Sequence, residues 1–213
     1  MFRLKKRQPY GKMKMFILSL SFLKGIGCIL GKYFDRWVRS YSVTPENSPE
    51  FFDIINDLYF TENMQSQAAF AQHSEINRLD HVRSVAYLTF LYCREHSLDI
   101  RTATRAAILH DLTYYDWHDG DWSHRPHGYR HPAFAAKNAK ELDPTLNEKG
   151  RFIILRHMWP LTVVPPKSKE GWAVSLIDKY CATREMMRGE IKYFARRFEE
   201  AKRLSEKKNT KNS

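Results

Sequence analysis

The chain has 213 residues, enough for one domain with a sizeable core and additional terminal segments. Hydrophobic residues make up 43% and aromatic residues 14%, which excludes an intrinsically disordered protein. The net charge of +11 lies at the two ends: residues 1–39 hold ten Lys or Arg and one acid, and residues 188–213 hold nine basic and four acidic residues. The stretch between them carries −3. This distribution disfavours a basic nucleic-acid groove through the fold and favours basic tails that are solvated or bind a surface.

The N-terminal part contains an apolar run over residues 15–30, MFILSLSFLKGIGCIL, interrupted by Lys24. The run is short for a membrane span, and no small-residue cleavage site follows it. A helix packed on the domain, a helix on a membrane surface, and a true span or signal all remain open. Three cysteines, Cys28, Cys93 and Cys181, form no CxxC pair and predict buried thiols in a reducing compartment, which favours a cytoplasmic protein.

Helical signals follow one another along the chain, and no pair of strands is evident. The predicted helices span residues 50–60, 64–72, 77 to about 95, 100–109, 132–142, 147–157 and 169–188. Asp99 is expected to cap the fourth of these, and Pro132 to begin the fifth. Residues 114–130 are expected to form a long loop. The sequence therefore predicts an all-α bundle, with an N-terminal helical segment over 1–49, the main domain over 50–190 and a basic end over 191–213.

A possible metal site begins with the adjacent pair His110 and Asp111. Neighbouring residues diverge in mid-helix, but at a helix end both can face one ion because the last turn is open. His81 lies early in an amphipathic helix, and Asp178 lies in the apolar stretch AVSLIDKYCA. A carboxylate in a largely buried helix is unfavourable unless it binds a cation or is otherwise satisfied. Two imidazoles and two carboxylates suit Mn, Fe, Zn or Mg.

The order His81, His110-Asp111, Asp178 resembles the H…HD…D signature of the HD superfamily of metal-dependent phosphohydrolases, over roughly Gln72 to Met187. The segments HPAFAAKNA at 131–139 and ILRHMWP at 154–160 resemble the two extra histidines of its binuclear branch. That branch includes diadenosine-tetraphosphate hydrolases and cyclic-di-GMP phosphodiesterases, whose Gly-Tyr-Pro motif is absent here. The pattern LHDxxxYDW…HP…HMWP is similar to small bacterial HD-domain proteins, which implies an HD-type helical bundle.

The resemblance implies roles for six residues. His81, His110, Asp111 and Asp178 hold a first metal ion, and His131 and His157 join Asp111, as a bridge, in holding a second. The residue before a proline is held extended, which lets His131 project from the start of the following helix. One or two divalent ions, Fe, Mn, Zn, Co or Mg, are the implied cofactors.

The expected activity is hydrolysis of a phosphate ester or anhydride, most simply in a nucleotide, by a metal-activated hydroxide. Asp111 and Lys179 are the expected catalytic residues. The expected substrate-binding residues are Asp116, Arg130, Arg156 and Lys179, with Arg78, Lys167 and Arg184 as further candidates for contacting phosphate. Three tryptophans could line a base-binding pocket or pack in the core: Trp117, Trp122 and Trp159. The loop histidines His118, His124 and His127 are expected to be solvated.

Two other classes of function remain open. One is a module that keeps the fold and senses a nucleotide without cleaving it, although a complete ligand set argues against this class. The other is an adaptor that uses residues 1–39 to bind a membrane surface or nucleic acid, which steep salt dependence would reveal. No specific nucleic-acid partner is expected, and the oligomeric state is open.

Overall fold

The computed structural model describes residues 33–73, 76–116, 122–124 and 126–189. The chain divides into two compact units, Met1–Arg39 and Ser40–Ser213. In the first, residues 33–39 are helical, and the rings of Phe34 and Trp37 lie 5.8 Å apart. The apolar run over 15–30 and the basic end over 191–213 lie outside the described residues, so the domain limits at 49 and 190 stay predictions.

The second unit is built almost wholly of helices. Its elements are α2 (Pro49–Tyr59), α3 (Glu62–Gln65), η1 (Ser66–Ala69), β1 (Ala71–His73), β2 (Ile76–Asn77), α4 (Arg78–Glu95), α5 (Ile100–Leu109), η2 (Trp122–His124), α6 (His127–Leu142) and α7 (Glu148–Arg156). A last helix covers residues 169–189 and is called the C-terminal helix below. The prediction of an all-α fold is confirmed.

Helix α4 forms the centre of the core. Its predicted apolar positions are all buried: Val82, Val85, Ala86, Leu88 and Leu91. Polar residues such as Ser84 and Thr89 are buried as well, so α4 is covered on nearly all faces. Of the elements from α2 to α7, it pairs most extensively with α5, whose Ala103, Ala106 and Ala107 are fully buried and allow close approach.

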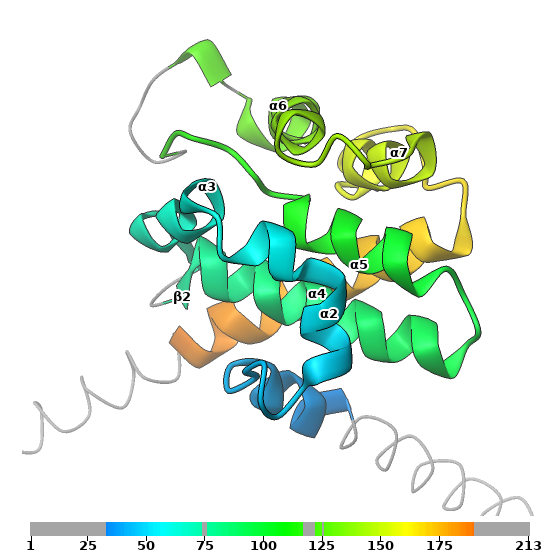
Figure 1. Cartoon of the computed structure of the whole chain (residues 1–213). Helices are drawn as coiled ribbons and strands as arrows, with labels where there is room; N and C mark the ends of the chain where they lie inside the picture. Colours follow the sequence, from blue (N-terminus) through cyan, green and yellow to red (C-terminus); the bar gives the residue numbers. More distant parts are fainter. Residues whose placement is uncertain (1–32, 74–75, 117–121, 125, 190–213) are drawn as a thin grey trace, which may run out of the picture. The chain divides into compact units, whose positions relative to one another are not determined.

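The other helices cover this pair. Helix α5 packs on α7 on its other side, and α7 lies beside α6 (Figure 1). The C-terminal helix, orange in Figure 1, contacts α4 through Cys181 and Ser84, whose Sγ and Oγ atoms are 3.5 Å apart. In this arrangement the first turn of α4, the ends of α5 and α7, and the middle of the C-terminal helix converge.

Several predicted boundaries agree with the structure. Asp99 caps α5 by accepting a hydrogen bond from the Thr102 amide over 3.1 Å, and Asn147 caps α7 in the same way through Gly150. The C-terminal helix begins at residue 169, as expected. Within the described residues, no helix combines the length and the apolar character needed to cross a membrane.

Two predictions of local structure were wrong. Helix α6 begins at His127, so Pro132 lies inside it and the predicted loop over 114–130 ends earlier. Pro132 lies one turn inside α6, where it supplies no N–H for the helix, and His131 before it is helical and not extended as the sequence predicted. The helix predicted over 64–72 ends as η1, and β1 pairs antiparallel with β2, with Ala71 opposite Asn77. Strands this short show no alternating pattern that a sequence could display.

Candidate metal centre

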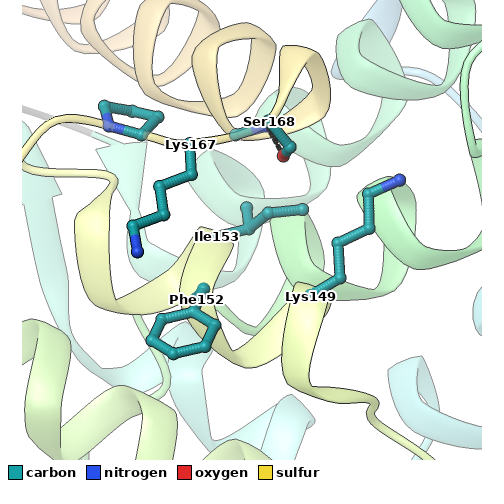
Figure 2. Close-up of a pocket in the computed structure, with 7 residues that line it drawn as sticks. Lys149, Phe152, Ile153, Lys167 and Ser168 are labelled. Atoms are coloured by element: carbon teal, nitrogen blue, oxygen red, sulfur yellow. Dashed lines mark hydrogen bonds between the residues drawn. The ribbon is translucent and has the colours of Figure 1, made fainter.

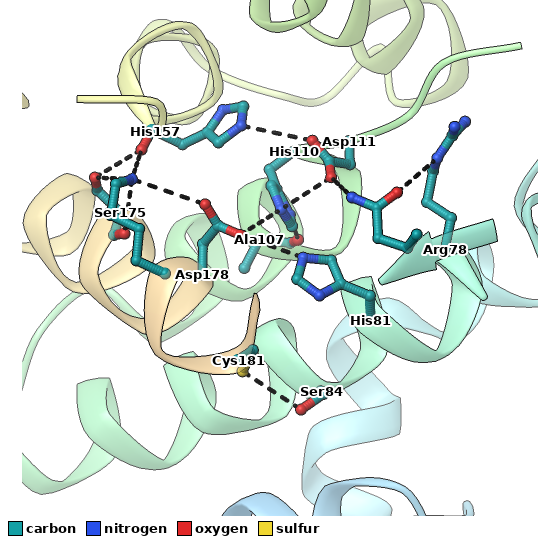
Figure 3. A network of polar contacts seen from close by, with 12 residues as sticks. Arg78, His81, Ser84, Ala107, His110, Asp111, His157, Ser175, Asp178 and Cys181 are labelled. Carbon is teal, nitrogen blue, oxygen red and sulfur yellow. Dashed lines mark hydrogen bonds and ion pairs between the residues drawn. The ribbon is translucent and has the colours of Figure 1, made fainter. Parts of the chain in front are cut away.

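Six buried His and Asp side chains meet inside the Ser40–Ser213 unit. The first turn of α4 supplies His81, the end of α5 supplies His110 and Asp111, α6 supplies His131, the end of α7 supplies His157, and the C-terminal helix supplies Asp178. Each is at most 8% exposed. These are the six residues that the sequence predicts as metal ligands, and the structure brings them together; five of them are labelled in Figure 3.

The end of α5 explains how two adjacent residues can face one site. The helix stops at Leu109, and His110 is its C-cap residue. His110 Nδ1 donates a hydrogen bond back to the Ala107 carbonyl over 2.7 Å, which turns the other ring nitrogen toward the cluster. Asp111 follows outside the helix and points into the same space.

All four imidazoles are oriented in this way. In each, Nδ1 lies within hydrogen-bond distance of an oxygen that only accepts, so Nδ1 carries the proton and the Nε2 lone pair is left for the cluster. The pairs are His81 with the Glu185 carboxylate (2.8 Å), His110 with the Ala107 carbonyl (2.7 Å), His131 with the His127 carbonyl (3.1 Å) and His157 with the Ile154 carbonyl (2.7 Å).

Asp111 is shared between two groups of donors. Its Oδ1 atom lies 3.1 Å from His131 Nε2 and 3.5 Å from His157 Nε2. Its Oδ2 atom lies 3.7 Å from His110 Nε2. We call His81, His110, Asp111 and Asp178 the first ligand group, and Asp111, His131 and His157 the second ligand group.

Asp178 completes the first ligand group. Its Oδ1 atom lies 3.2 Å from His81 Nε2 and 3.6 Å from His110 Nε2. Three sets of three residues have ligand atoms that all lie within 4.8 Å of one another, namely His81, His110 and Asp111; His110, His157 and Asp178; and Asp111, His131 and His157.

The nitrogen and oxygen atoms of the cluster make poor hydrogen-bond partners for one another, but they suit a divalent cation. His110 Nε2 is buried and has no hydrogen-bond partner among the described residues. His131 Nε2 and His157 Nε2 lie 2.9 Å apart, although both rings have their Nδ1 protons committed to carbonyl oxygens. Two lone pairs at this distance repel unless a cation lies near both, and imidazole nitrogens with carboxylate oxygens are suitable ligands for Mn, Fe and Zn.

The charges of the cluster favour cation binding. Burial alone would raise the pKa of Asp111, but His110, His131 and His157 hold it well below its ordinary value. The pKa of Asp178 shifts in the same way. Burial raises it, but His110 and His81 lower it well below its ordinary value. For His81, burial lowers the pKa, but Glu185 and Asp178 raise it well above its ordinary value, so an ion that binds His81 Nε2 must displace a proton from it.

The surroundings of Asp178 differ in part from the expectation. The sequence predicted a largely buried helix there, and Val174 and Cys181 are indeed fully buried, but Leu176 is 56% exposed. Two imidazoles compensate the buried carboxylate directly, which an apolar stretch of sequence could not indicate.

Two residues that the sequence did not indicate, Glu185 and Tyr41, hold the His81 ring in place. Glu185 is 1% exposed, and its second carboxylate oxygen accepts a hydrogen bond from the Tyr41 hydroxyl over 2.6 Å. Glu185 follows Asp178 by seven residues, two helical turns, so both lie on the same face of the C-terminal helix. That spacing was a usable signal that Glu185 belongs to the site.

Two further residues support Asp111: Gln72 contacts its carboxylate, and Arg78 contacts Gln72. Gln72 on β1 donates from Nε2 to Asp111 Oδ2 over 2.6 Å, and Arg78 donates from Nε to Gln72 Oε1 over 3.2 Å. Asp111 and Arg78 are labelled in Figure 3. The sequence suggested Arg78 for binding phosphate. The structure instead places it among protein acceptors, including the Thr113 carbonyl.

Lys179 lies at the edge of the cluster. Its Nζ atom donates to the His157 carbonyl over 2.7 Å and to the Ser175 carbonyl over 3.2 Å, and it lies 3.8 Å from Asp178 Oδ2. The side chain is 35% exposed, and burial lowers its pKa, with Asp178 and Asp111 opposing that shift. The Lys179 amine therefore lies directly beside the first ligand group.

Two of the other predicted substrate residues, Arg130 and Arg156, contact groups outside the cluster. Arg130 is exposed, and its guanidinium lies 5.5 Å from the Phe134 ring centre. Arg156 donates to the Pro165 carbonyl over 3.3 Å and lies over Phe152. Asp116 is half-buried. The roles of Arg130, Arg156 and Asp116 in binding substrate stay predictions.

The aromatic and histidine residues of the loop have mixed positions. His127 was expected to be solvated, but it is half-buried and its ring stacks on His131 with centroids 4.5 Å apart. Trp122 is 80% exposed, and Trp159 packs edge-on against Trp172 at 4.8 Å. Trp117 and His118, and the side chain of His124, lie outside the described residues.

Two hollows in the described part of the chain lie apart from the ligand groups. One of about 110 Å³ is lined by Lys149, Phe152, Ile153, Pro166, Lys167, Ser168 and Gly171 (Figure 2). Another of about 420 Å³ is lined by Ala133, Ala136, Lys137, Lys140, Glu141, Arg151 and Leu155. Neither is lined by any of the six clustered residues.

Comparison with known families agrees with this geometry. Residues 78–183 match the family model described as HD domain. The match covers about half of the chain and contains all six clustered residues. No curated protein and no solved structure matches the chain.

Proposed function

Since residues 78–183 belong to the HD domain family, we propose that the chain is a metal-dependent phosphohydrolase that cleaves a phosphate ester or anhydride, with a nucleotide as substrate. The observation that carries the proposal is the pair of buried ligand groups that share Asp111. The cofactors are divalent ions, one in each ligand group. The choice among Mn, Fe, Co, Zn and Mg is left to experiment.

Divalent ions in these groups supply Lewis-acid stabilisation of phosphate charge and lower the pKa of a coordinated water. The side chains of the cluster hold the ligand atoms in fixed positions. Asp111 fixes the spacing of the two groups, because its two oxygens face different histidines. The Nδ1 bonds prevent the imidazoles from rotating away, so the ligand geometry is formed before substrate arrives.

Lys179 is the residue that we propose for contact with substrate phosphate. Its amine is partly exposed, and it is anchored at the His157 carbonyl beside the first ligand group. A positive charge in this place offsets phosphate charge that the ions leave unbalanced. Arg130, Arg156 and Asp116 are proposed to contact the rest of the substrate.

The test is a substrate screen with the full chain. Chelated protein is reloaded separately with Mn²⁺, Fe²⁺, Co²⁺, Zn²⁺ or Mg²⁺ and given nucleoside phosphates, dinucleoside polyphosphates and simple phosphate esters. We expect phosphate release with at least one combination, its loss in His110→Ala, and its retention in His96→Ala, a matched control at an exposed position. Nucleotide binding by metal-loaded protein without any cleavage would instead support a sensing module.

A further inference from the structure

The hairpin of β1 and β2 carries a side chain that reaches the metal centre. Gln72 Nε2 donates to Asp111 Oδ2 over 2.6 Å. Oδ2 is the oxygen that faces His110, whereas Oδ1 faces His131 and His157. Gln72 therefore holds the half of the shared carboxylate that belongs to the first ligand group.

Arg78 determines which end of the Gln72 amide faces Asp111. Arg78 Nε donates to Gln72 Oε1 over 3.2 Å. Because a guanidinium only donates, the amide oxygen must face Arg78, and the amide NH₂ must then face the carboxylate. Reversing the amide would set an oxygen against the carboxylate and an NH₂ against the guanidinium.

Arg78 is itself fixed on several sides. It is 1% exposed, and Nη1 donates to Gln67 Oε1 and to the carbonyl and hydroxyl oxygens of Thr113, all within 3.2 Å. Nη2 donates to the Tyr115 carbonyl, and the guanidinium lies 4.7 Å from the Phe70 ring centre. A buried cation held in this way is a rigid support.

We propose that Arg78 and Gln72 are positioning residues that hold the Asp111 carboxylate in the rotation that gives one oxygen to each ligand group. We call them the Arg78–Gln72 relay. Without the Gln72 donor, the carboxylate can turn and place both oxygens toward one group. The inference deepens the proposed function, because it rests on ions that share Asp111, and it assigns Arg78 to metal organisation instead of phosphate binding.

The test uses Gln72→Met, which keeps the length of the side chain and removes its donor and acceptor. Mn²⁺ alone is the probe, titrated into chelated full-length protein and followed by electron paramagnetic resonance. We expect the Mn²⁺ dissociation constant to rise about 10- to 100-fold and the signal of a magnetically coupled ion pair to give way to that of isolated ions. The matched control is Gln65→Met, which loses a bond to the Tyr59 carbonyl in the same region.

If Gln72 has only a structural role, Gln72→Met lowers the melting temperature of the chelated protein and leaves the coupled signal intact. Gln72→Met that binds Mn²⁺ with wild-type affinity and coupling would overturn the relay. Arg78→Lys keeps the charge and loses the Nε donor, so it should shift the affinity in the same direction. If Arg78→Lys fails to fold, Gln72→Met decides alone.

Failure of the proposed function gives different results. Wild-type protein that binds coupled Mn²⁺ ions but cleaves no phosphate contradicts the activity and leaves the relay standing. Wild-type protein that binds a single Mn²⁺ ion contradicts the two-ion arrangement, and with it the shared role of Asp111 that the relay supports. If, in that case, the Mn²⁺ dissociation constant of Gln72→Met equals that of wild type, Gln72 has no role in holding the single ion.

Discussion

Glu185 fixes the orientation of the His81 ring through its carboxylate. It accepts from His81 Nδ1 over 2.8 Å and from the Tyr41 hydroxyl over 2.6 Å, and its side chain is fully buried. A carboxylate behind a ligating imidazole fixes the tautomer and makes the other nitrogen a stronger ligand. The affinity of the first ligand group should therefore depend on a residue that does not touch the ion.

Glu185→Gln keeps the shape of the side chain and removes its charge. We expect the variant to bind Mn²⁺ about 10- to 100-fold more weakly than wild type, because His81 loses its anionic partner. A Mn²⁺ titration against a competing chelator measures this. Glu141→Gln, at an exposed position on α6, is the control, and equal affinities of wild type and Glu185→Gln would rule out this role.

At this scale the sequence indicates ligands better than it indicates their supports. His110-Asp111 and Asp178 carry ligand chemistry in their residue types and order, and the HP and HMWP contexts mark His131 and His157. Glu185 could have been found from its spacing to Asp178. Gln72 could not, because an amide has no ligand signature and its contact depends on the course of a hairpin that the sequence does not reveal.

Helices α2, α5 and the end of α6 are joined by one buried cation. Arg105 on α5 binds both carboxylate oxygens of Asp57 on α2, at 2.7 and 2.9 Å, and Asp143 after α6, at 2.9 Å. Burial raises the pKa of Asp143, but its bonds with Arg105 and Thr145 lower it below the ordinary value of 3.8. Folding therefore favours the ionised form of Asp143.

The sign of this shift predicts a pH dependence of stability. Because the folded pKa is the lower one, the stabilisation is present above the ordinary pKa and disappears as the pH falls through the folded value. Asp143→Asn should reduce the free energy of unfolding near pH 7 by about 1.5 to 3 kcal/mol. Near pH 2 the difference from wild type should shrink. Urea unfolding at both pH values measures it.

The control for this prediction is Asp53→Asn, an exposed carboxylate on α2. It should leave the free energy of unfolding nearly unchanged at both pH values. If Asp143→Asn loses as much stability near pH 2 as near pH 7, the ionised form of Asp143 is not what stabilises the fold.

The course of most elements followed from periodicity and capping residues, as at Asp99 and Asn147. The start of α6 did not, because proline favours the first turn of a helix, whereas Pro132 lies one turn inside α6. The hairpin escaped prediction because β2 has two residues, too few for any pattern. Both errors fall beside the metal centre, where tertiary contacts decide the local structure.

At the level of the whole molecule, the strongest basic segment and the ligand groups lie in different units. The ligand groups lie in the Ser40–Ser213 unit, whereas residues 1–39 carry a net charge of +9 and contain an apolar run. Contact of this segment with a membrane surface stays a prediction, and it concerns residues that mostly lie outside the described ones. Such binding should be electrostatic and should weaken as salt screens the charges.

Removing residues 1–39 tests this prediction. The full chain should sediment with vesicles that contain phosphatidylserine, less so as the salt concentration rises and hardly with neutral phosphatidylcholine vesicles. The truncated chain should stay in the supernatant. Equal sedimentation of the two chains would assign membrane contact to another surface or exclude it.

We propose that Asp111 joins two buried metal sites. Anomalous diffraction at the Mn edge, on crystals of the Mn²⁺-loaded protein, tests it most directly. We expect two anomalous peaks, one bounded by His81, His110 and Asp178 and the other by His131 and His157, with Asp111 bonded to both. A single peak, or two peaks that do not share Asp111, would contradict it.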